Sequence, residues 1–423
     1  MKSIILHYIS AITVDIDDSF FRNTRKGCVY FLNSGILKGD TTIKNIYMKI
    51  ISVFNNKGGV GKSTLTYHIG NTLAELGHRV LMVDLDPQCN LTICTMMEED
   101  LHQIWEEEDS FIDDYERAYG QNPEIINSPR SIHFILKPTE DGISEPANLS
   151  PPYSIGTNID LLPGRLSLHK YENKIAERWS GVYQGDNLAI RTVTNIRNIC
   201  QRYAETNNYD YVLIDTSPSL GILNKVIMST VDGFFIPAQP DMFSLYGIRN
   251  IGNALQLWQR EFISIYSLIS EEKRSKFPLH FVQFLGYTIY NAKKYTRDNE
   301  PFNEYNLAQA HYQYVSRIPE IIMQFIQESN RTRISADLIS RPIGGDSIIH
   351  SHNTFPAMAQ ALKCPMWRVP EIYAALEKTN PEYLALLNQN GFEYNRGNNG
   401  RLREIGIKYR AFANDLLTRI NSL

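Results

Sequence analysis

The chain of 423 residues is long enough to bury a large core and to form two or three domains. Apolar residues make up 43% of it and charged residues 21%, which is typical of a globular protein and excludes a disordered one. The net charge of −4 excludes a protein that is basic over its whole surface, so any contact with nucleic acid must come from a local patch.

Targeting and redox signals are weak in this sequence. No apolar run reaches the length of a transmembrane helix, so we expect no membrane span. Cys89 and Cys94 are too few to hold zinc or an iron–sulfur cluster, and the other three cysteines are scattered. Free thiols of this kind suit a reducing cytosol, so we expect a cytoplasmic protein.

Residues 1–47 precede the first predicted strand, which is β-branched and apolar over 50–54. The extension shows no two helices joined by a tight turn, as a helix-turn-helix domain would require. It is either an upstream start that is not used or a real appendage. We expect the main domain to span 48–423.

A glycine-rich segment with two lysines follows this strand. It matches the phosphate-binding pattern G-x-x-x-x-G-K-[ST] only in a variant form, with an additional lysine at its front. Glycines let backbone N–H groups curl around phosphate oxygens, Lys62 then reaches the β- and γ-phosphates, and the Ser63 hydroxyl can bind Mg²⁺. A helix predicted over 65–76 points its N-terminus at the anion. The predicted nucleotide-binding segment consists of Lys57, Gly58, Gly59, Val60, Gly61, Lys62, Ser63 and Thr64.

Aspartates end two apolar strands further along the chain. The strand over 78–83 leads into Asp84 and Asp86, and the strand over 211–214 ends in Asp215. Carboxylates at the C-terminal ends of parallel strands lie where open α/β sheets bind ligands. Asp215 is therefore predicted to hold Mg²⁺ through water, because Mg²⁺ keeps much of its hydration in proteins.

With its leading Lys57, the phosphate loop resembles that of the deviant Walker A ATPases, the ParA/MinD family, and within it the ParA-like partition ATPases. The Asp-Leu-Asp-Pro-Gln segment at 84–88, the strand that ends in Asp215 and the segment 232–241 are similar to further motifs of that family, in the same order. The resemblance runs from 48 to about 291. It implies a doubly wound α/β P-loop fold with a mainly parallel sheet and helical insertions.

The resemblance also implies roles for individual residues. Lys57 would cross a dimer interface to the partner's nucleotide, as an arginine finger does, although by itself it could be a solvated lysine. Asp86 would orient or activate the attacking water, and Asp84 would hold a water of the Mg²⁺ shell. Asn291, which ends a strand over 285–291, is either an adenine contact or a strand-capping residue. The implied catalytic residues are Lys57, Lys62 and Asp86, and the implied metal site is Ser63, Asp84 and Asp215.

As a function, the resemblance implies an ATPase that needs ATP and Mg²⁺ and works as a dimerisation switch. Two copies would close face to face with ATP, bind DNA without sequence preference, and partition or position a cargo with a ParB-like stimulating partner. Two other functions stay open. One is a MinD-like positioning ATPase on a membrane, and the other is a regulatory or defence-associated module with little turnover.

Two insertions interrupt the alternation of strands and helices, at about 95–158 and 292–345. The first has ten carboxylates between Glu98 and Glu116, which form either a partner surface or a solvated helical face. The second is mainly helical by pattern. Its basic cluster at 293–297 is either a phosphate contact or an ordinary surface loop.

The chain ends in a predicted amphipathic helix. Its apolar stripe either lies on a membrane or packs the last helix on the sheet, and the pattern favours packing. The stripe consists of Leu402, Ile405, Tyr409, Phe412, Leu416 and Ile420.

Overall fold

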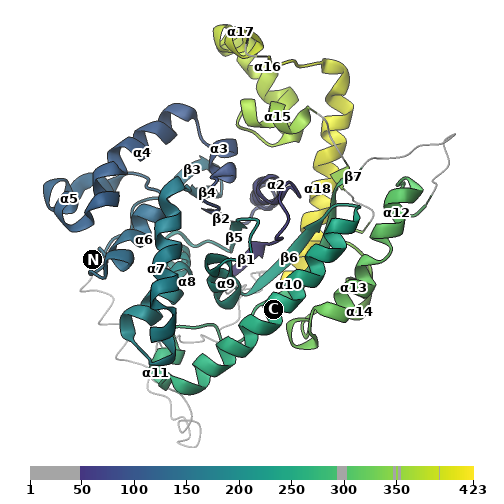
Figure 1. Ribbon diagram of the computed structural model, residues 1–423. Helices are drawn as coiled ribbons and strands as arrows, with labels where there is room; N and C mark the ends of the chain where they lie inside the picture. The colour runs from purple at the N-terminus through teal and green to yellow at the C-terminus, as the bar shows by residue number, and fades with distance from the viewer. Residues whose placement is uncertain (1–47, 293–302, 346–348, 351–353, 390) are drawn as a thin grey trace, which may run out of the picture. The chain divides into compact units, whose positions relative to one another are not determined.

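The computed structural model describes residues 48–292, 303–345, 349–350, 354–389 and 391–423. Its strands form one eight-stranded sheet in the order β3-β4-β2-β5-β1-β6-β7-β8, and Figure 1 labels the first seven strands of this order. Every neighbouring pair is parallel except β3 with β4, which confirms the predicted mainly parallel sheet. The strands are β1 Lys49–Val53, β2 Val80–Leu85, β3 Tyr153–Gly156, β4 Ile159–Leu162, β5 Tyr211–Thr216, β6 Gly233–Ala238, β7 Gln283–Ala292 and β8 Ile349–His350.

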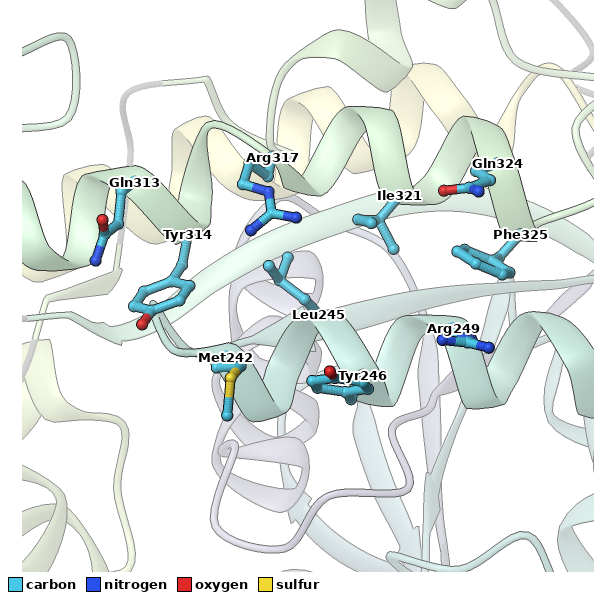
Figure 2. A pocket seen from close by; sticks show the side chains of 10 residues that line it. All are labelled: Met242, Leu245, Tyr246, Arg249, Gln313, Tyr314, Arg317, Ile321, Gln324 and Phe325. Atoms are coloured by element: carbon cyan, nitrogen blue, oxygen red, sulfur yellow. The ribbon is translucent and has the colours of Figure 1, made fainter.

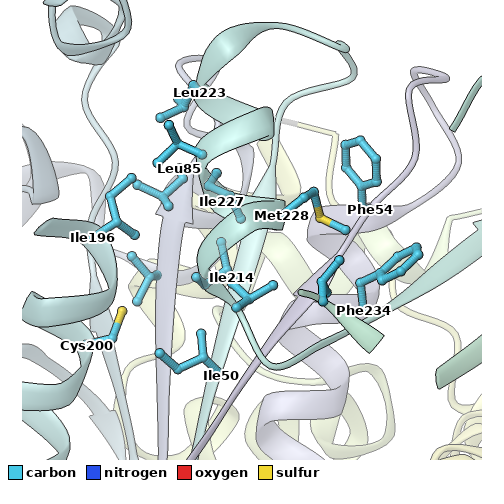
Figure 3. Packing of buried hydrophobic residues seen from close by; sticks show 14 of the residues in the cluster. Ile50, Phe54, Leu85, Ile196, Cys200, Ile214, Leu223, Ile227, Met228 and Phe234 are labelled. Carbon is cyan, nitrogen blue, oxygen red and sulfur yellow. The ribbon is translucent and has the colours of Figure 1, made fainter. Parts of the chain in front are cut away.

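Helices cover both faces of this sheet because alternate strand residues point to opposite sides. On one side, Ile50, Ile214 and Phe234 pack against helices that follow β4, β5 and β6 (Figure 3). On the other side, Ile51 and Leu213 pack against the first and last helices. The first group of helices is α7 His169–Tyr183, α8 Asn187–Asn207, α9 Ile222–Thr230 and α10 Met242–Leu268, and the second is α2 Lys62–Glu75 and α18 Asn399–Ile420. This is the doubly wound arrangement that the sequence predicted.

The acidic stretch between β2 and β4 is largely helical. It contains α3 Asn90–Thr95, α4 Glu98–Asp113, α5 Tyr115–Gln121 and α6 Ile132–Asp141. Glu108 is fully buried and accepts hydrogen bonds from the backbone N–H and hydroxyl of Ser131 at 2.7 and 2.6 Å. Arg165 lies 3.2 Å from the same carboxylate, and Arg130 pairs with Glu107. The acidic run is therefore only partly a solvated face, because arginines from outside the helix neutralise its inner side.

The described residues between β7 and β8 include the short helices α12 Gln309–Val315, α13 Ile318–Phe325 and α14 Ala336–Ser340, and α11 Glu271–Arg274 precedes β7. Helix α13 packs on α10 at Gly252, where a Cβ would lie 2.7 Å from the carbonyl carbon of Phe325. Only glycine permits this close approach. The basic cluster at 293–297 and the extension 1–47 lie outside the described residues.

The C-terminal part consists of α15 Phe355–Ala361, α16 Val369–Thr379, α17 Pro381–Gln389 and α18. All six residues of the predicted apolar stripe of α18 are buried, and the rings of Phe412 and Phe235 lie 5.8 Å apart. The interpretation of this helix as the last one packed on the sheet is confirmed. A helix that lay on a membrane would need the same face free. Among the described residues, no helix has the length and hydropathy that crossing a bilayer requires.

Candidate nucleotide-binding site

The phosphate loop connects β1 to α2, and two of its glycines have left-handed backbone. Gly59 has φ 71° and Gly61 has φ 80°, a region that costs glycine little and most other residues much. Gly61 caps α2, so Lys62, Ser63 and Thr64 form its first turn. The N–H groups of this turn have no partner within the helix, which makes the turn an anion-binding element.

Lys62 lies between carboxylates at the base of the loop. Its side chain is almost buried, and its Nζ is 3.4 Å from the carbonyl oxygen of Lys57. Burial lowers the pKa of Lys62, while the nearby Asp215 and Asp86 act in the opposite direction. The ammonium group of Lys62 therefore lies between the loop and the aspartates that were predicted from the sequence to form the site.

Asp84 and Asp215 lie on neighbouring strands, in register with each other. Asp84 is well satisfied: its Oδ2 accepts from the N–H and hydroxyl of Thr92 at 2.8 and 2.6 Å, and its Oδ1 accepts from the N–H of Asp86 at 3.2 Å. Burial raises the pKa of Asp84 to about 6 despite these hydrogen bonds. Thr92 was not expected from the sequence, because its contact depends on how α3 packs under β2.

Asp215 is fully buried, and neither carboxylate oxygen has a hydrogen-bond partner of normal geometry among the described residues. Burial and then Asp84 raise its pKa well above the usual range, whereas the Ser63 hydroxyl and Lys62 oppose the rise. The buried carboxylates of Asp84 and Asp215 carry more negative charge than the single ammonium group of Lys62 can neutralise. A divalent cation would supply the missing positive charge.

The residues therefore fit Mg²⁺ held mostly through water. Within the described ranges, no three carboxylate, imidazole or thiolate side chains converge as direct metal ligands. Mg²⁺ sites in nucleotide enzymes commonly use one or two carboxylates together with the substrate's phosphates and several waters. Ser63 and Asp215 would hold the ion, and Asp84 would act beside them.

Lys57 is held within its own chain. Its Nζ donates to Gln239 Oε1 at 2.8 Å and to Asp241 Oδ2 at 2.5 Å, and it lies 5.9 Å from the centre of the Phe243 ring. Gln239 also donates to the carbonyl oxygen of Gly59 at 2.9 Å. Lys57 is thus not an ordinary solvated lysine. Sequence reasoning missed both partners, although both belong to the segment 232–241 that carried the resemblance.

Asp241 is also the N-cap of α10, because its Oδ1 accepts from the N–H of Ser244 at 2.8 Å. Partial burial alone would raise its pKa. The hydrogen bonds from Lys57 and from the Ser244 backbone outweigh burial, so the pKa of Asp241 lies below its usual value. Asp241 is consequently charged at neutral pH and pairs with Lys57.

Asn291 lies at the end of β7, as predicted, with its side chain exposed and φ 57°. The residue that contacts the phosphate loop from this strand is its neighbour Tyr290, whose ring lies on Gly61. The sequence gave no signal for this contact, because a tyrosine at a strand end is common.

A groove of about 600 Å³ runs between α10 and the helices α12 and α13, beginning one residue after Asp241 (Figure 2). Arg249 and Arg317 lie on its two sides, and the guanidinium of Arg249 is 5.3 Å from the centre of the Phe325 ring. None of the described residues that line it is acidic. The groove is a local basic patch in a chain of negative net charge.

The chain is similar to several known proteins over the part that contains this site. A protein family described as "AAA domain" matches residues 48–266. The sporulation initiation inhibitor protein Soj of Bacillus subtilis is 29% identical over 213 residues, which cover 50% of this chain and 66% of Soj. The uncharacterized protein MJECL24 of Methanocaldococcus jannaschii is 31% identical over 204 residues, which cover 48% of this chain and 63% of that protein.

Among solved structures, protein DIP2308 from Corynebacterium diphtheriae is similar in fold, with a TM-score of 0.56 and 24% identity over 76% of this chain and 98% of that one. The chain spans about half to two thirds of the length of the curated relatives it matches. The family match covers half of the chain and includes the phosphate loop, Asp84, Asp86 and Asp215. The chain belongs to the ParA/MinD family of P-loop ATPases.

Proposed function

We propose that this protein binds ATP with Mg²⁺ at the phosphate loop and hydrolyses it as a dimerisation switch. The observation that carries the proposal is the arrangement around Lys62. A buried ammonium group meets the first turn of α2 and the fully buried Asp215 at the end of β1, and the carboxylate oxygens of Asp215 have no hydrogen-bond partner of normal geometry among the described residues. Such a cluster has the charges to bind a polyanion, ATP, together with a cation, Mg²⁺. Phosphoryl transfer depends mainly on positioning these groups and neutralising their charge.

Each residue has a defined part in this reaction. Lys62 binds the β- and γ-phosphates, and the backbone of 58–64 surrounds them. Mg²⁺, when bound, neutralises charge that develops on the phosphate oxygens. Asp86 is nearly buried and accepts from the N–H of Gln88 at 3.0 Å, which fixes its carboxylate so that it can orient the attacking water.

Lys57 would act across the dimer. In the single chain it is neutralised by Asp241, so formation of the dimer exchanges an ion pair within the chain for a phosphate of the partner's nucleotide. The exchange makes closure depend on ATP, because the pair with Asp241 is given up only where a more highly charged anion is offered.

The task we propose is partition or positioning of DNA or another cargo, in the cytoplasm, with a ParB-like protein that stimulates hydrolysis. The similarity to Soj and to proteins called ParA family proteins supports this assignment. Burial of the apolar face of α18 removes the main support for a MinD-like membrane role. A module with little turnover would differ from the proposed switch in a steady-state ATPase assay with and without DNA.

The decisive experiment measures dimerisation by sedimentation with ATP and Mg²⁺, in an Asp86→Ala background that blocks turnover. The background variant is expected to form a dimer, and adding Lys57→Ala should abolish it while most ATP affinity remains. Adding Lys62→Ala should abolish ATP binding itself. A dimer as tight with Lys57→Ala as without it would contradict the role across the interface, and unchanged ATP affinity with Lys62→Ala would contradict the nucleotide site.

A further inference from the structure

The side-chain amide of Gln239 joins two residues of the phosphate loop. Its Oε1 accepts a hydrogen bond from Lys57 Nζ at 2.8 Å, and its Nε2 donates to the carbonyl oxygen of Gly59 at 2.9 Å. An ammonium group can only donate and a carbonyl oxygen can only accept, so these two partners determine the orientation of the amide. The side chain at position 239 must supply one acceptor and one donor, which an amide does and a carboxylate or a thioether does not.

The backbone of Gln239 is held by the first turn of α10. Its N–H donates to the hydroxyl of the fully buried Ser244 at 3.0 Å, and its carbonyl oxygen accepts from the N–H of Asp241 at 2.8 Å. Asp241 is also the N-cap of this helix. The amide of Gln239 therefore extends towards the phosphate loop from a fixed backbone.

A second contact joins the end of β6 to the start of the loop. Asn55 is fully buried, donates to the carbonyl oxygen of Pro237 at 2.6 Å and accepts from the N–H of Lys57 at 2.9 Å. Strands β6 and β1 are parallel neighbours, so their carboxyl ends lie at the same edge of the sheet. The segment that ends β6 thus contacts the loop at Asn55, before the glycines, and at Gly59, within them.

The two glycines at the front of the loop have few other contacts. Gly58 and Gly59 are exposed, and an added Cβ at either position would lie more than 4 Å from any heavy atom outside the adjoining residues. Glycine can change its backbone conformation at little cost, so a hydrogen bond to the Gly59 carbonyl has a large influence on how the Gly59–Val60 peptide is oriented. In a trans peptide the carbonyl and the N–H point in opposite directions. The bond from Gln239 therefore directs the N–H of Val60 away from Gln239.

From this geometry we infer that Gln239 is a positioning residue, which orients the phosphate loop for nucleotide and at the same time restrains Lys57. A loop whose peptide groups are oriented before the ligand arrives loses less conformational freedom on binding, and affinity rises accordingly. The restraint on Lys57 acts in the other direction, because this lysine must leave its own chain to reach a partner's nucleotide. The inference rests on the proposed function, since it assumes that nucleotide binds at this loop.

Two substitutions test the effect on the loop. Gln239→Met keeps the length of the side chain and removes both hydrogen bonds, and Gln239→Asn keeps the amide but shortens its reach by one methylene. Each should lower ATP affinity by about fivefold, the size expected for one hydrogen bond. Calorimetric titration with ATP and Mg²⁺ in a Lys57→Ala, Asp86→Ala background measures the loss. Neither turnover nor dimerisation should interfere in that background, and only the contact with Gly59 remains to be lost.

Dimerisation tests the effect on Lys57. Gln239→Met removes one hydrogen bond of Lys57 within its own chain, whereas the pair with Asp241 remains. In an Asp86→Ala background with saturating ATP, the dimer should therefore be at least as tight as without the substitution. In the otherwise wild-type chain, KM should rise and kcat at saturating ATP should be retained, because Gln239 does not touch the reacting atoms.

Gln259→Met is the matched control. Gln259 lies further along α10, where its Oε1 accepts from the hydroxyl of Ser329 at 3.0 Å. The same chemical change at this position should leave ATP affinity unchanged. The thermal midpoint of Gln239→Met should stay close to that of the wild type, because Gln239 is only partly buried.

Unchanged ATP affinity in Gln239→Met or in Gln239→Asn would overturn the inference. A loss of affinity that Gln259→Met shares, or that parallels a loss of thermal stability, would also overturn it, because the effect would then be a general structural one. A weaker dimer at saturating ATP would contradict the restraint on Lys57. ATP binding that is lost in Lys62→Ala supports the nucleotide site whatever Gln239 does, so failure of the proposed function is distinguishable from failure of this inference.

Discussion

At the scale of single residues, the readiness of the site for nucleotide depends on which charged side chains are paired before any ligand binds. Lys62 lies near the carboxylates of Asp215 and Asp86, and in the described part of the chain Asp215 has no hydrogen-bond partner of normal geometry, whereas Lys57 is paired with Asp241. The first two leave the site ready for a polyanion with a cation. The ion pair with Asp241 restrains Lys57, the lysine that is proposed to act on another subunit.

The Lys57–Asp241 pair yields a prediction about dimerisation. Asp241→Asn should tighten the ATP-dependent dimer in an Asp86→Ala background, by up to about fivefold, because a partly exposed ion pair contributes roughly 0.2–1 kcal/mol. Asparagine is as good an N-cap as aspartate, so α10 should keep its stability. Sedimentation equilibrium measures the change. A dimer weaker than that of the Asp86→Ala parent would show that Asp241 supports Lys57 instead of restraining it.

At the scale of elements, buried side chains connect α18 to the sheet and to α2. Phe412 of α18 packs on Phe235 of β6, and His68 of α2 packs on Tyr409 of α18. These contacts connect the helix that begins at the phosphate loop to the end of the chain.

Phe412→Ala should lower the free energy of unfolding by about 3–5 kcal/mol, the usual loss for a large buried aromatic side chain. Ile407→Ala, on the same helix but 69% exposed, is the control and should change it by less than about 0.5 kcal/mol. Urea denaturation provides the measurement. Equal effects of the two substitutions would mean that α18 does not pack as the structure shows.

His68 predicts how stability depends on pH. Its pKa is about 4 in the folded protein, below the ordinary histidine value of about 6.5, so the unfolded state binds the extra proton first as pH falls. The contribution of His68 to stability is therefore complete above pH about 6.5 and declines as pH falls towards 4, by an amount on the order of 3 kcal/mol.

Substituting His68→Gln should flatten the fall in unfolding free energy between pH 6.5 and 4, measured by urea denaturation at each pH. His102, which is exposed on α4, is the matched control, and His102→Gln should leave the profile unchanged. An unaltered slope in His68→Gln would show that His68 is not buried as a neutral ring.

At the scale of the whole molecule, the charges are unevenly distributed. Arginines from outside α4 neutralise the carboxylates on the inner side of this acidic helix. The groove between α10 and α13 contains Arg249 and Arg317, and none of the described residues that line it is a carboxylate. A chain with net charge −4 can still attract a polyanion to one such patch.

If DNA binds at the groove, Arg249→Glu and Arg317→Glu, each made singly and then together, should weaken binding to duplex DNA of any sequence. The slope of log affinity against log salt should fall by about one unit for each lost phosphate contact. Arg260→Glu, an exposed arginine of α10 outside the groove, is the control for overall charge. Fluorescence anisotropy over a salt series measures both. Equal weakening by Arg260→Glu and by either groove substitution would mean that net charge, and not this groove, governs binding.

The sequence by itself determined the fold class and the order of the motifs. Strands buried on both faces appear as continuous apolar runs, and the loop between β1 and α2 has a residue pattern that few other structures need. The last helix was also correctly interpreted, because its apolar stripe has the period of a helix packed on one side. These features are local, so the sequence carries them directly.

Only the tertiary structure decided which side chains meet. Gln239 and Asp241 reach Lys57 because β6 lies beside β1, and Tyr290 reaches Gly61 because β7 lies beside β6. Thr92 satisfies Asp84 because α3 turns back under β2. Each of these contacts joins residues from different elements, and no periodicity or spacing along the chain encodes such a meeting. It follows from strand order and packing, which are properties of the folded chain as a whole.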